Sequence, residues 1–291
     1  MAYSDILAFD KTVSKLRTFF KDRNFVEVHT QSRLSILAAC EDPKTIATFN
    51  YLGKPWPLPQ TGQMWLEHDL LKNPEVPGLF CVSTSYRQEL NPIPGRHDLI
   101  FPMFEFETHG GLETLQELEE DLLEWLGFGT KELFFAKNYS AMTDYYGVKE
   151  IDNECEKKIW EEFGPVFFLK HFPLYTSPFW NMKKVDDKAK KIDVILYGIE
   201  TIGSAERSTD TAEMREEFHT ISDGMYADIL YSQFGKERVE KELEEFLSFD
   251  FFPRCGGGIG VTRMIRALSL AEEAKTSLRT HKTIISPEIR F

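Results

Sequence analysis

The chain has 291 residues, and its 34 lysines and arginines against 47 aspartates and glutamates give a formal net charge of −13 at pH 7. This acidic balance argues against an extended nucleic-acid surface, and 42% hydrophobic residues with 24 phenylalanines exclude bulk disorder. No apolar run approaches the roughly 20 residues of a membrane helix, and no signal peptide is visible, so we expect a cytoplasmic protein without a membrane partner. No linker composition divides residues 1–291, which are expected to form a single domain. The four cysteines show no metal-binding spacing and are expected to be buried, reduced thiols.

The first half of the chain predicts helices and a long hairpin. Apolar residues recur at helical spacing over Asp5–Asp22 and again over Leu112–Trp125. Strands are predicted over Phe25–His29, Gly78–Gln88 and Leu99–Glu107. The last two are joined by the turn-rich segment Glu89–His97 and read as a hairpin.

The second half predicts shorter elements. In chain order they are a solvated hairpin tip over Lys183–Lys191, a strand over Ile192–Tyr197, a turn or bulge region over Gly198–Arg207, a helix over Lys236–Leu247, and a glycine-rich stretch over Cys255–Gly260 before a helix from about Val261. Two interpretations of Ser208–Thr211 stay open, a helix cap and a lid over the substrate. Strands mixed with scattered helices, without regular βαβ units, indicate an α+β fold with an antiparallel sheet flanked by helices.

The predicted hairpin carries the first candidate site. Arg87 and Glu89 lie two positions apart and therefore share one face of a strand. On the returning strand one face is polar and aromatic (Phe101, Met103, Glu105, Glu107), and the other is apolar (Ile100, Pro102, Phe104, Phe106). A planar cation, a carboxylate acceptor and an aromatic ring are what a nucleotide requires. A solvated hairpin with ordinary surface charges is the alternative.

Two further segments carry weaker signals. Glycines over Gly256–Gly260, followed by Arg263 in the first turn of a helix, suit an anion, although tight strand-to-helix packing explains them equally well. Asp193 and Glu200 are natural Mg²⁺ ligands. Their separation of seven places them on opposite faces of a regular strand, so a shared metal requires a bulge, for which Gly198 is the expected position. Two unrelated acids are the alternative.

Together these segments resemble class II aminoacyl-tRNA synthetases, in particular the subgroup specific for aspartate, asparagine and lysine. The hairpin Val82–Glu107 is similar to motif 2, Gly256–Arg263 to motif 3, and Phe25–Thr30 with the preceding helix to motif 1. Asp193 and Glu200, followed by Gly203 and Arg207, resemble the segment between motifs 2 and 3, and Gln60–Glu67 resembles the substrate-binding strand. The resemblance runs from about residue 10 to residue 270 and implies the class II catalytic fold.

The resemblance also implies chemistry: ATP bends around Mg²⁺, and an amino-acid carboxylate attacks its α-phosphate. No general base is needed, since the carboxylate is already ionised. The implied catalytic residues are Arg87, on the α-phosphate and the substrate carboxylate, and Arg263, near the γ-phosphate. Further implied contacts with ATP come from Glu89 (adenine amino group), Phe101 (stacked on adenine), His97 (outer phosphates), Glu200 and Gly260, and the implied metal ligands are Asp193 and Glu200.

For the amino acid, the resemblance implies that Glu41 and Gln63 bind the α-ammonium group and that Arg207 binds the side-chain oxygen. Aspartate-binding relatives often carry a lysine at the position of Leu66, which here is followed by Glu67, as in asparaginyl enzymes. An acid at this position would accept from an amide and repel a carboxylate, so aspartate and asparagine both remain open as substrates.

The chain departs from the synthetases in three respects. Gln31 replaces the proline of motif 1, and Thr262 replaces the acid before the motif 3 arginine. The form Gly256–Arg263 is closer to ammonia-dependent asparagine synthetase. The N-terminal barrel domain with which tRNA ligases read the anticodon is not evident, and no basic stretch replaces it.

These features favour an AMP-forming ligase that converts aspartate and ammonia to asparagine. Transfer of the activated amino acid to tRNA, to a protein or to a small molecule is the second hypothesis, with tRNA possible but not favoured. A regulatory paralogue that only binds ATP or an amino acid is the third. Because motif 1 builds the dimer interface in relatives, the resemblance also implies a homodimer.

Overall fold

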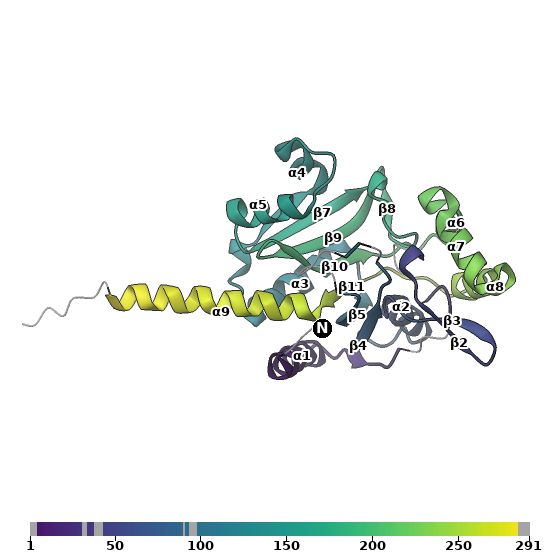
Figure 1. Ribbon diagram of the computed structural model, residues 1–291, viewed down its shortest axis with the longest axis horizontal. Coiled ribbons are helices and arrows are strands. Elements are labelled where there is room, and N and C mark those ends of the chain that lie inside the picture. Colours follow the sequence, from purple (N-terminus) through teal and green to yellow (C-terminus); the bar gives the residue numbers. More distant parts are fainter. Residues whose placement is uncertain (1–4, 31–33, 38–42, 90, 93–97, 285–291) are drawn as a thin grey trace, which may run out of the picture.

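The computed structural model describes residues 5–30, 34–37, 43–89, 91–92 and 98–284, with the backbone alone for 278–284. Nine of its strands form one sheet in the spatial order β1-β4-β5-β11-β10-β9-β7-β6, with β8 beside β9 (Figure 1). These strands are β1 (Val26–Glu27), β4 (Gly78–Tyr86), β5 (Ile100–His109), β6 (Phe135–Asn138), β7 (Val166–Pro173), β8 (Lys184–Val185), β9 (Lys188–Leu196), β10 (Ile199–Glu206) and β11 (Arg254–Gly260). A separate hairpin consists of β2 (Thr48–Tyr51) and β3 (Lys54–Pro57).

The predicted α+β class with an antiparallel sheet flanked by helices is confirmed. All sheet neighbours run antiparallel except the pairs β1–β4 and β6–β7. The helices are α1 (Ile6–Lys21), α2 (Gln63–Lys72), α3 (Leu112–Leu126), α4 (Tyr139–Tyr146), α5 (Asn153–Phe163), α6 (Thr211–Thr220), α7 (Met225–Phe234), α8 (Lys236–Leu247) and α9 (Val261–Ile284). Among the described residues, no helix is long and apolar enough to cross a bilayer.

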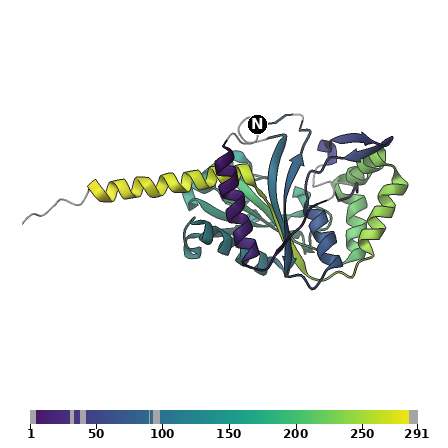
Figure 2. The ribbon, with the colours of Figure 1, turned by 90° about the horizontal axis from the view of Figure 1, so that it is seen from below.

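Three helices cover one face of the sheet, which we call the back face. The apolar stripes of α1, α3 and the first part of α9 pack there into one core cluster. The ring of Phe20 in α1 lies 5.1 Å from Phe104 and 5.0 Å from Phe106, which confirms the predicted apolar face of this strand. Asp5 caps α1 by accepting two backbone N–H groups, as its sequence position favours. The C-terminal half of α9 projects away from the rest of the molecule (Figures 1 and 2).

The opposite, front face is covered only at its two ends. Over β7 and β9, α4 and α5 pack on Phe167, Leu169 and Ile195. At the other end, α2 lies over β4 and β5, with α6, α7 and α8 beyond it in a second core cluster. The middle of the front face, over β5, β11 and β10, therefore remains accessible to a ligand.

Several predicted elements need correction. The segment Lys183–Lys191 is not one solvated tip, because β9 begins at Lys188 and continues the pairing with β7 and β8. Gly198–Arg207 contains the strand β10, and Cys255–Gly260 is also a strand. Gln60–Glu67 is a loop that enters helix α2 rather than a strand.

Other predictions are confirmed. The helix Lys236–Leu247 has the predicted bounds, and Asp210 caps α6, as expected for a capping segment. Cys81, Cys155 and Cys255 are buried free thiols, whereas Cys40 lies outside the described residues. Of the predicted strand Phe25–His29, only Val26–Glu27 pairs with the sheet.

One buried acid in the back layer has a strongly shifted pKa. Glu119 of α3 is fully buried, and burial raises the pKa of its carboxyl group from 4.5 to about 8. The nearby Ser204 hydroxyl lowers this pKa, but not enough to offset burial. The carboxyl group is therefore protonated in the native protein at neutral pH, while it is ionised in the unfolded chain.

We predict that Glu119→Gln removes part of the pH dependence of stability. Because the pKa is higher in the folded state, the contribution of Glu119 to stability is complete below pH 4.5 and is lost as the pH rises towards 8. The pKa change from 4.5 to about 8 corresponds to a loss of roughly 4–5 kcal/mol in the free energy of unfolding once the pH exceeds both values. Urea denaturation should therefore give similar free energies of unfolding for the wild-type protein and Glu119→Gln at pH 5. At pH 9 the free energy of unfolding should be higher for Glu119→Gln. The exposed Glu117→Gln on the same helix is the control, and equal wild-type and Glu119→Gln curves at pH 9 would contradict the prediction.

Candidate active site

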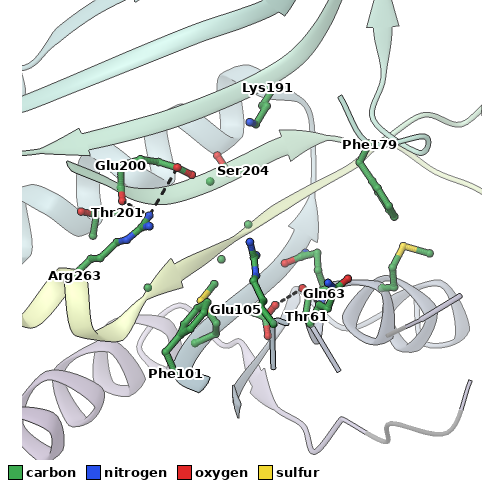
Figure 3. A pocket seen from close by; sticks show the side chains of 18 of the residues that line it. Thr61, Gln63, Phe101, Glu105, Phe179, Lys191, Glu200, Thr201, Ser204 and Arg263 are labelled. Atoms are coloured by element: carbon green, nitrogen blue, oxygen red, sulfur yellow. Dashed lines mark hydrogen bonds and ion pairs between the residues drawn. The ribbon is translucent and has the colours of Figure 1, made fainter. Parts of the chain in front are cut away.

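A pocket of about 440 Å³ lies in the middle of the front face, between α2 and the strands β5, β11, β10 and β9 (Figure 3). In Figure 3, Glu200 and Lys191 lie on one wall, and Phe101, Glu105 and Gln63 lie on the opposite wall. The pocket brings together nine of the residues singled out from the sequence: Gln63, Glu67, Arg87, Glu89, Phe101, Glu200, Arg207, Gly260 and Arg263.

The remaining candidates lie elsewhere or cannot be placed. Asp193 lines a smaller adjoining cavity of about 190 Å³, which shares Lys191 and Glu200 with the main pocket. Glu41 and His97 lie outside the residues that the structure describes, as does Gln31.

The two arginines of the proposed phosphate site reach the pocket from different elements. Arg87 follows the last residue of β4, and its backbone N–H donates to the Leu99 carbonyl at 2.8 Å, which extends the hairpin by one step. Its guanidinium carbon lies 5.7 Å from the centroid of the Phe101 ring. Arg263 stands in the first turn of α9 and donates from Nη1 to the Glu200 carbonyl oxygen at 2.7 Å. Two guanidinium groups 176 positions apart thus line one pocket.

Three glycines of β11, Gly257, Gly258 and Gly260, line the floor of the pocket, and Gly256 precedes them on the same strand. A Cβ atom at Gly256 would lie 2.0 Å from Glu107 Oε2 and 2.2 Å from the Phe106 carbonyl oxygen. At Gly258 it would lie 2.6 Å from the terminal methyl group of Met103. At both positions neighbouring side chains already fill the space of a Cβ atom, so glycine allows β11 to pack closely against residues of β5 and α2.

Asp193 and Glu200 face the same side of the β9–β10 hairpin because the turn at Tyr197 and Gly198 pairs Glu200 with Ile195, which shares the face of Asp193. The register shifts between Glu200 and Ile202, so Thr201 is the extra residue, and Asp193 pairs opposite Gly203. The expectation that the two acids need a bulge at Gly198 to share a face is therefore wrong, because they lie on two strands joined by a turn; the bulge at Thr201 instead brings Gly203 onto their face. The oxygens Glu200 Oε1 and Asp193 Oδ1 would lie 3.1 and 3.6 Å from a Cβ atom at Gly203.

This convergence of two carboxylates on a bare glycine suits a divalent cation. Magnesium prefers carboxylate oxygens and keeps several waters or substrate phosphates as its other ligands. Within the described ranges, no group of three or more His, Cys, Asp and Glu side chains is placed to hold a metal, so these two acids would supply only part of the coordination.

A buried network of charges closes the deep end of the pocket. Arg254 donates from Nε and Nη2 to Glu67 Oε2 at 3.2 and 2.7 Å, and Arg207 Nε lies 3.4 Å from Glu67 Oε1. Arg207 Nη2 also lies 3.4 Å from Glu107 Oε2, which accepts a further hydrogen bond from the Gln63 amide. Both glutamates and both arginines are at most 4% exposed, and two positive charges face two acids.

The network shifts the pKa values of its members. Burial raises the pKa of Glu107 to about 7, and the charge of Glu67 adds to this effect, whereas Arg207 opposes it. Burial alone would lower the pKa of Arg207, but the charges of Glu107 and Glu67 more than offset it and raise this pKa. Arg207 therefore remains a cation within reach of the pocket.

Sequence reasoning missed residues that hold the site in place. The backbone N–H of Gly62 donates to both carboxylate oxygens of Glu105, at 2.9 and 2.8 Å, and the Thr61 hydroxyl donates to the same carboxylate. These contacts fix the loop that leads into α2. Asn181 donates to Glu67 at 2.8 Å. The alternating pattern of β5 placed Glu105 on the correct face, but nothing local marks Asn181 or Arg254 as a partner of Glu67.

Comparisons with known proteins place this architecture among the tRNA synthetases. Residues 2–277 match the profile of the family described as "tRNA synthetases class II (D, K and N)". The chain is 23% identical over 293 aligned positions to the Aspartate--tRNA(Asp/Asn) ligase of Methanopyrus kandleri, covering 89% of this chain and 63% of that ligase. A shorter stretch of 119 residues is 30% identical to the Aspartate--tRNA(Asp) ligase of Pyrobaculum aerophilum, covering 40% of this chain and 24% of that protein.

Solved structures show the same fold. Asparaginyl-tRNA synthetase from Pyrococcus horikoshii, complexed with asparaginyl-adenylate, superposes with a TM-score of 0.72 at 20% identity, covering 90% of this chain and 64% of that one. A putative aspartyl-tRNA synthetase from Leishmania major superposes with a TM-score of 0.70 at 17% identity, covering 91% of this chain and 62% of that one. The chain thus spans just under two thirds of these longer relatives.

We predict that two glycines of β11 differ in their tolerance of alanine. Gly256→Ala meets a backbone oxygen and a buried carboxylate, so overpacking should cost about 1–3 kcal/mol or more. Gly258→Ala meets only the flexible end of Met103 and should cost less than about 1 kcal/mol. Chemical denaturation of both variants measures the difference, and equal stabilities would contradict the described packing of β11.

Proposed function

The chain belongs to the class II (D, K and N) tRNA synthetase family, and we propose that it activates an amino acid with ATP, forming an aminoacyl-adenylate and releasing pyrophosphate. The observation that carries this proposal is the meeting of Arg87, Arg263 and Arg207 in one pocket over the glycine floor of β11. Three cations around a bare strand suit a ligand with several negative charges, such as ATP together with a carboxylate.

We propose that ATP occupies the part of the pocket between Arg87, Phe101 and Arg263. Adenine stacks on Phe101, with Arg263 on its other face, and its amino group donates to Glu89. Arg87 holds the α-phosphate and the attacking carboxylate, and Gly260 borders the nucleotide. Charge that develops on the phosphorus centre and on the leaving pyrophosphate is then neutralised by fixed guanidinium groups.

Asp193 and Glu200 are the proposed Mg²⁺ ligands. Their convergence on Gly203 supports this assignment. When bound, the metal would neutralise phosphate oxygens and favour the departure of pyrophosphate.

Aspartate is the proposed amino acid, with asparagine as the alternative. Gln63 and Glu41 would bind the α-ammonium group, and Arg207 would bind the far end of the substrate. The concern that Glu67 repels a carboxylate is reduced, because Arg254, Arg207 and Asn181 already compensate its charge. We therefore assign Glu67 to orienting the two arginines rather than to reading an amide.

Ammonia is the proposed acceptor, which would give asparagine and AMP. The amide of asparagine forms on the side-chain carboxylate, so that group must face Arg87 and the α-phosphorus, and Arg207 would then hold the α-carboxylate. Transfer to tRNA is the second candidate, because the relatives with printed activities are tRNA ligases. In that route the α-carboxylate is activated and the side chain faces Arg207.

Pyrophosphate exchange with each amino acid, followed by product analysis with ammonia and with tRNA, tests these proposals. Exchange with aspartate and ammonia-dependent formation of asparagine would support the first route, and charging of tRNA would support the second. Exchange with asparagine alone would overturn aspartate as the substrate. Absence of exchange with every amino acid would favour the binding-only hypothesis.

The homodimer and the cytoplasmic location also stay proposals. In a homodimer, the partner subunit would cover Ile6 and Leu7, which are exposed at the start of α1. Light scattering measures the molar mass in solution, and the mass of a monomer at micromolar protein concentration would overturn the homodimer. The free thiols of the described cysteines support a reducing compartment, which fractionation of the native host can check.

We predict that Arg87→Ala lowers the rate of pyrophosphate exchange by roughly 100-fold or more, because a preorganised donor to the transition-state charge is lost. Arg215→Ala, which removes an exposed arginine paired with Glu244, is the matched control and should leave the rate unchanged. Full exchange activity in Arg87→Ala would remove this residue from the catalytic assignment.

We also predict that Glu200→Gln raises the Mg²⁺ concentration needed for half-maximal exchange several-fold, because one anionic ligand becomes neutral. A magnesium titration of the exchange rate measures this shift. The exposed Glu216→Gln on α6 is the control. An unchanged magnesium requirement in Glu200→Gln would show that the metal is held by other groups.

A further inference from the structure

Lys191 is a cation of the pocket wall that the sequence analysis assigned to a solvated hairpin tip. It stands on β9, its side chain is 15% exposed, and it lines both the main pocket and the adjoining cavity. Its ammonium nitrogen lies 3.2 Å from Asp193 Oδ2 and 4.3 Å from the centroid of the Phe172 ring. The side chain is therefore held at the boundary between the two cavities rather than in solvent.

The strand register places Lys191 close to the deep end of the pocket. Lys191 pairs directly opposite Ala205 of β10, and Arg207 follows Ala205 by two residues on the same face. Diagonal neighbours of this kind lie roughly 7–8 Å apart, within reach of a long side chain. A rotation of the flexible lysine stem can thus carry its ammonium group from Asp193 to the space in front of Arg207.

The buried charges around Arg207 are balanced before a substrate binds, so a substrate carboxylate needs one more cation to neutralise it. When both acids are ionised, Glu67 and Glu107 match the charges of Arg207 and Arg254, so a substrate carboxylate that enters this end adds an unmatched negative charge. Leu66, where aspartate-binding relatives often carry a lysine, is fully buried against Leu70 and Cys81 and does not line the pocket. Of the described cations that line the pocket, Arg87 and Arg263 belong to the proposed nucleotide end, which leaves Lys191 beside Arg207.

We propose that Lys191 is a specificity-determining residue that, together with Arg207, binds the carboxylate of a dicarboxylic amino acid that is not activated. This inference rests on the proposed function. It applies to both acceptors, because one carboxylate of aspartate faces Arg207 whichever of the two reacts. In the substrate-free protein, the contacts with Asp193 and Phe172 hold the ammonium group at the side of the pocket.

The test compares wild-type protein with Lys191→Met, Lys191→Gln and Lys191→Arg. Lys188→Met is the matched control, because Lys188 lies on the same strand, pairs with the exposed Asp187 and does not line either cavity. Pyrophosphate exchange gives KM values for aspartate, asparagine and ATP, and calorimetry gives the affinity for aspartate directly. Thermal denaturation verifies that each variant is folded.

We expect Lys191→Met and Lys191→Gln to raise KM for aspartate about 10- to 100-fold, the range for loss of one charge-assisted hydrogen bond. In these variants KM for ATP should change less than about twofold, and KM for asparagine, where exchange occurs, should change as little. Lys191→Arg should restore most of the affinity for aspartate.

Three results would overturn the inference alone: unchanged aspartate affinity in both neutral variants, an equal loss for ATP, or an equal loss for asparagine. Absence of aspartate exchange in the wild-type protein would overturn aspartate as the substrate of the proposed function, and this inference with it. The wild-type measurement therefore separates failure of the function from failure of the role of Lys191.

Discussion

Two arginines and two glutamates are buried under the pocket, and each of these charges is stable there only because an opposite charge lies beside it. Removing Arg254 or Glu67 would leave an opposite charge in a site with almost no solvent contact, and such losses typically cost about 3–5 kcal/mol. Because Glu67 lies on α2, Glu107 on β5 and Arg254 on β11, their contacts fix the helix against the sheet. The position of the pocket and the direction of Arg207 both follow from this buried charge balance.

The pocket itself depends on a strand without side chains and on one extra residue in its neighbour. Glycines on β11 line the pocket and allow the side chains of Met103 and Glu107 to lie directly against the strand. On β10, the bulge at Thr201 brings Gly203 to the face that Asp193 and Glu200 share, whereas regular alternation from Glu200 would place Gly203 on the other face. The bulge thus places a residue without a side chain between the two acids, beside the glycines that line the pocket.

The sequence predicted best what depends on local periodicity. The alternation in Leu99–Glu107 assigned Phe104 to the core and Phe101 to the pocket face, and the structure agrees because this strand is regular. The prediction that Asp193 and Glu200 need a bulge at Gly198 was wrong, because Gly198 forms a two-residue turn with Tyr197, both with positive φ, and this turn places the two acids on one face of a hairpin. The pairing of Arg254 with Glu67 could not be predicted, because the partners lie 187 positions apart. Lys191 was misassigned because a lysine-rich strand end resembles a solvated turn.

The place of β11 in the sheet has a consequence for how the protein is made. This strand lies between β5 and β10, yet it is the last strand of the sheet to leave the ribosome. Without β11, the remaining strand pairings divide into β1, β4 and β5 on one side and β6 to β10 on the other, and β5 and β10 each lack a neighbour at their inner edge. Joining them late makes folding of this chain dependent on long-range pairing, which is slow and exposes those edges to aggregation. Protease protection of stalled nascent chains, ended before and after this strand, would reveal the step.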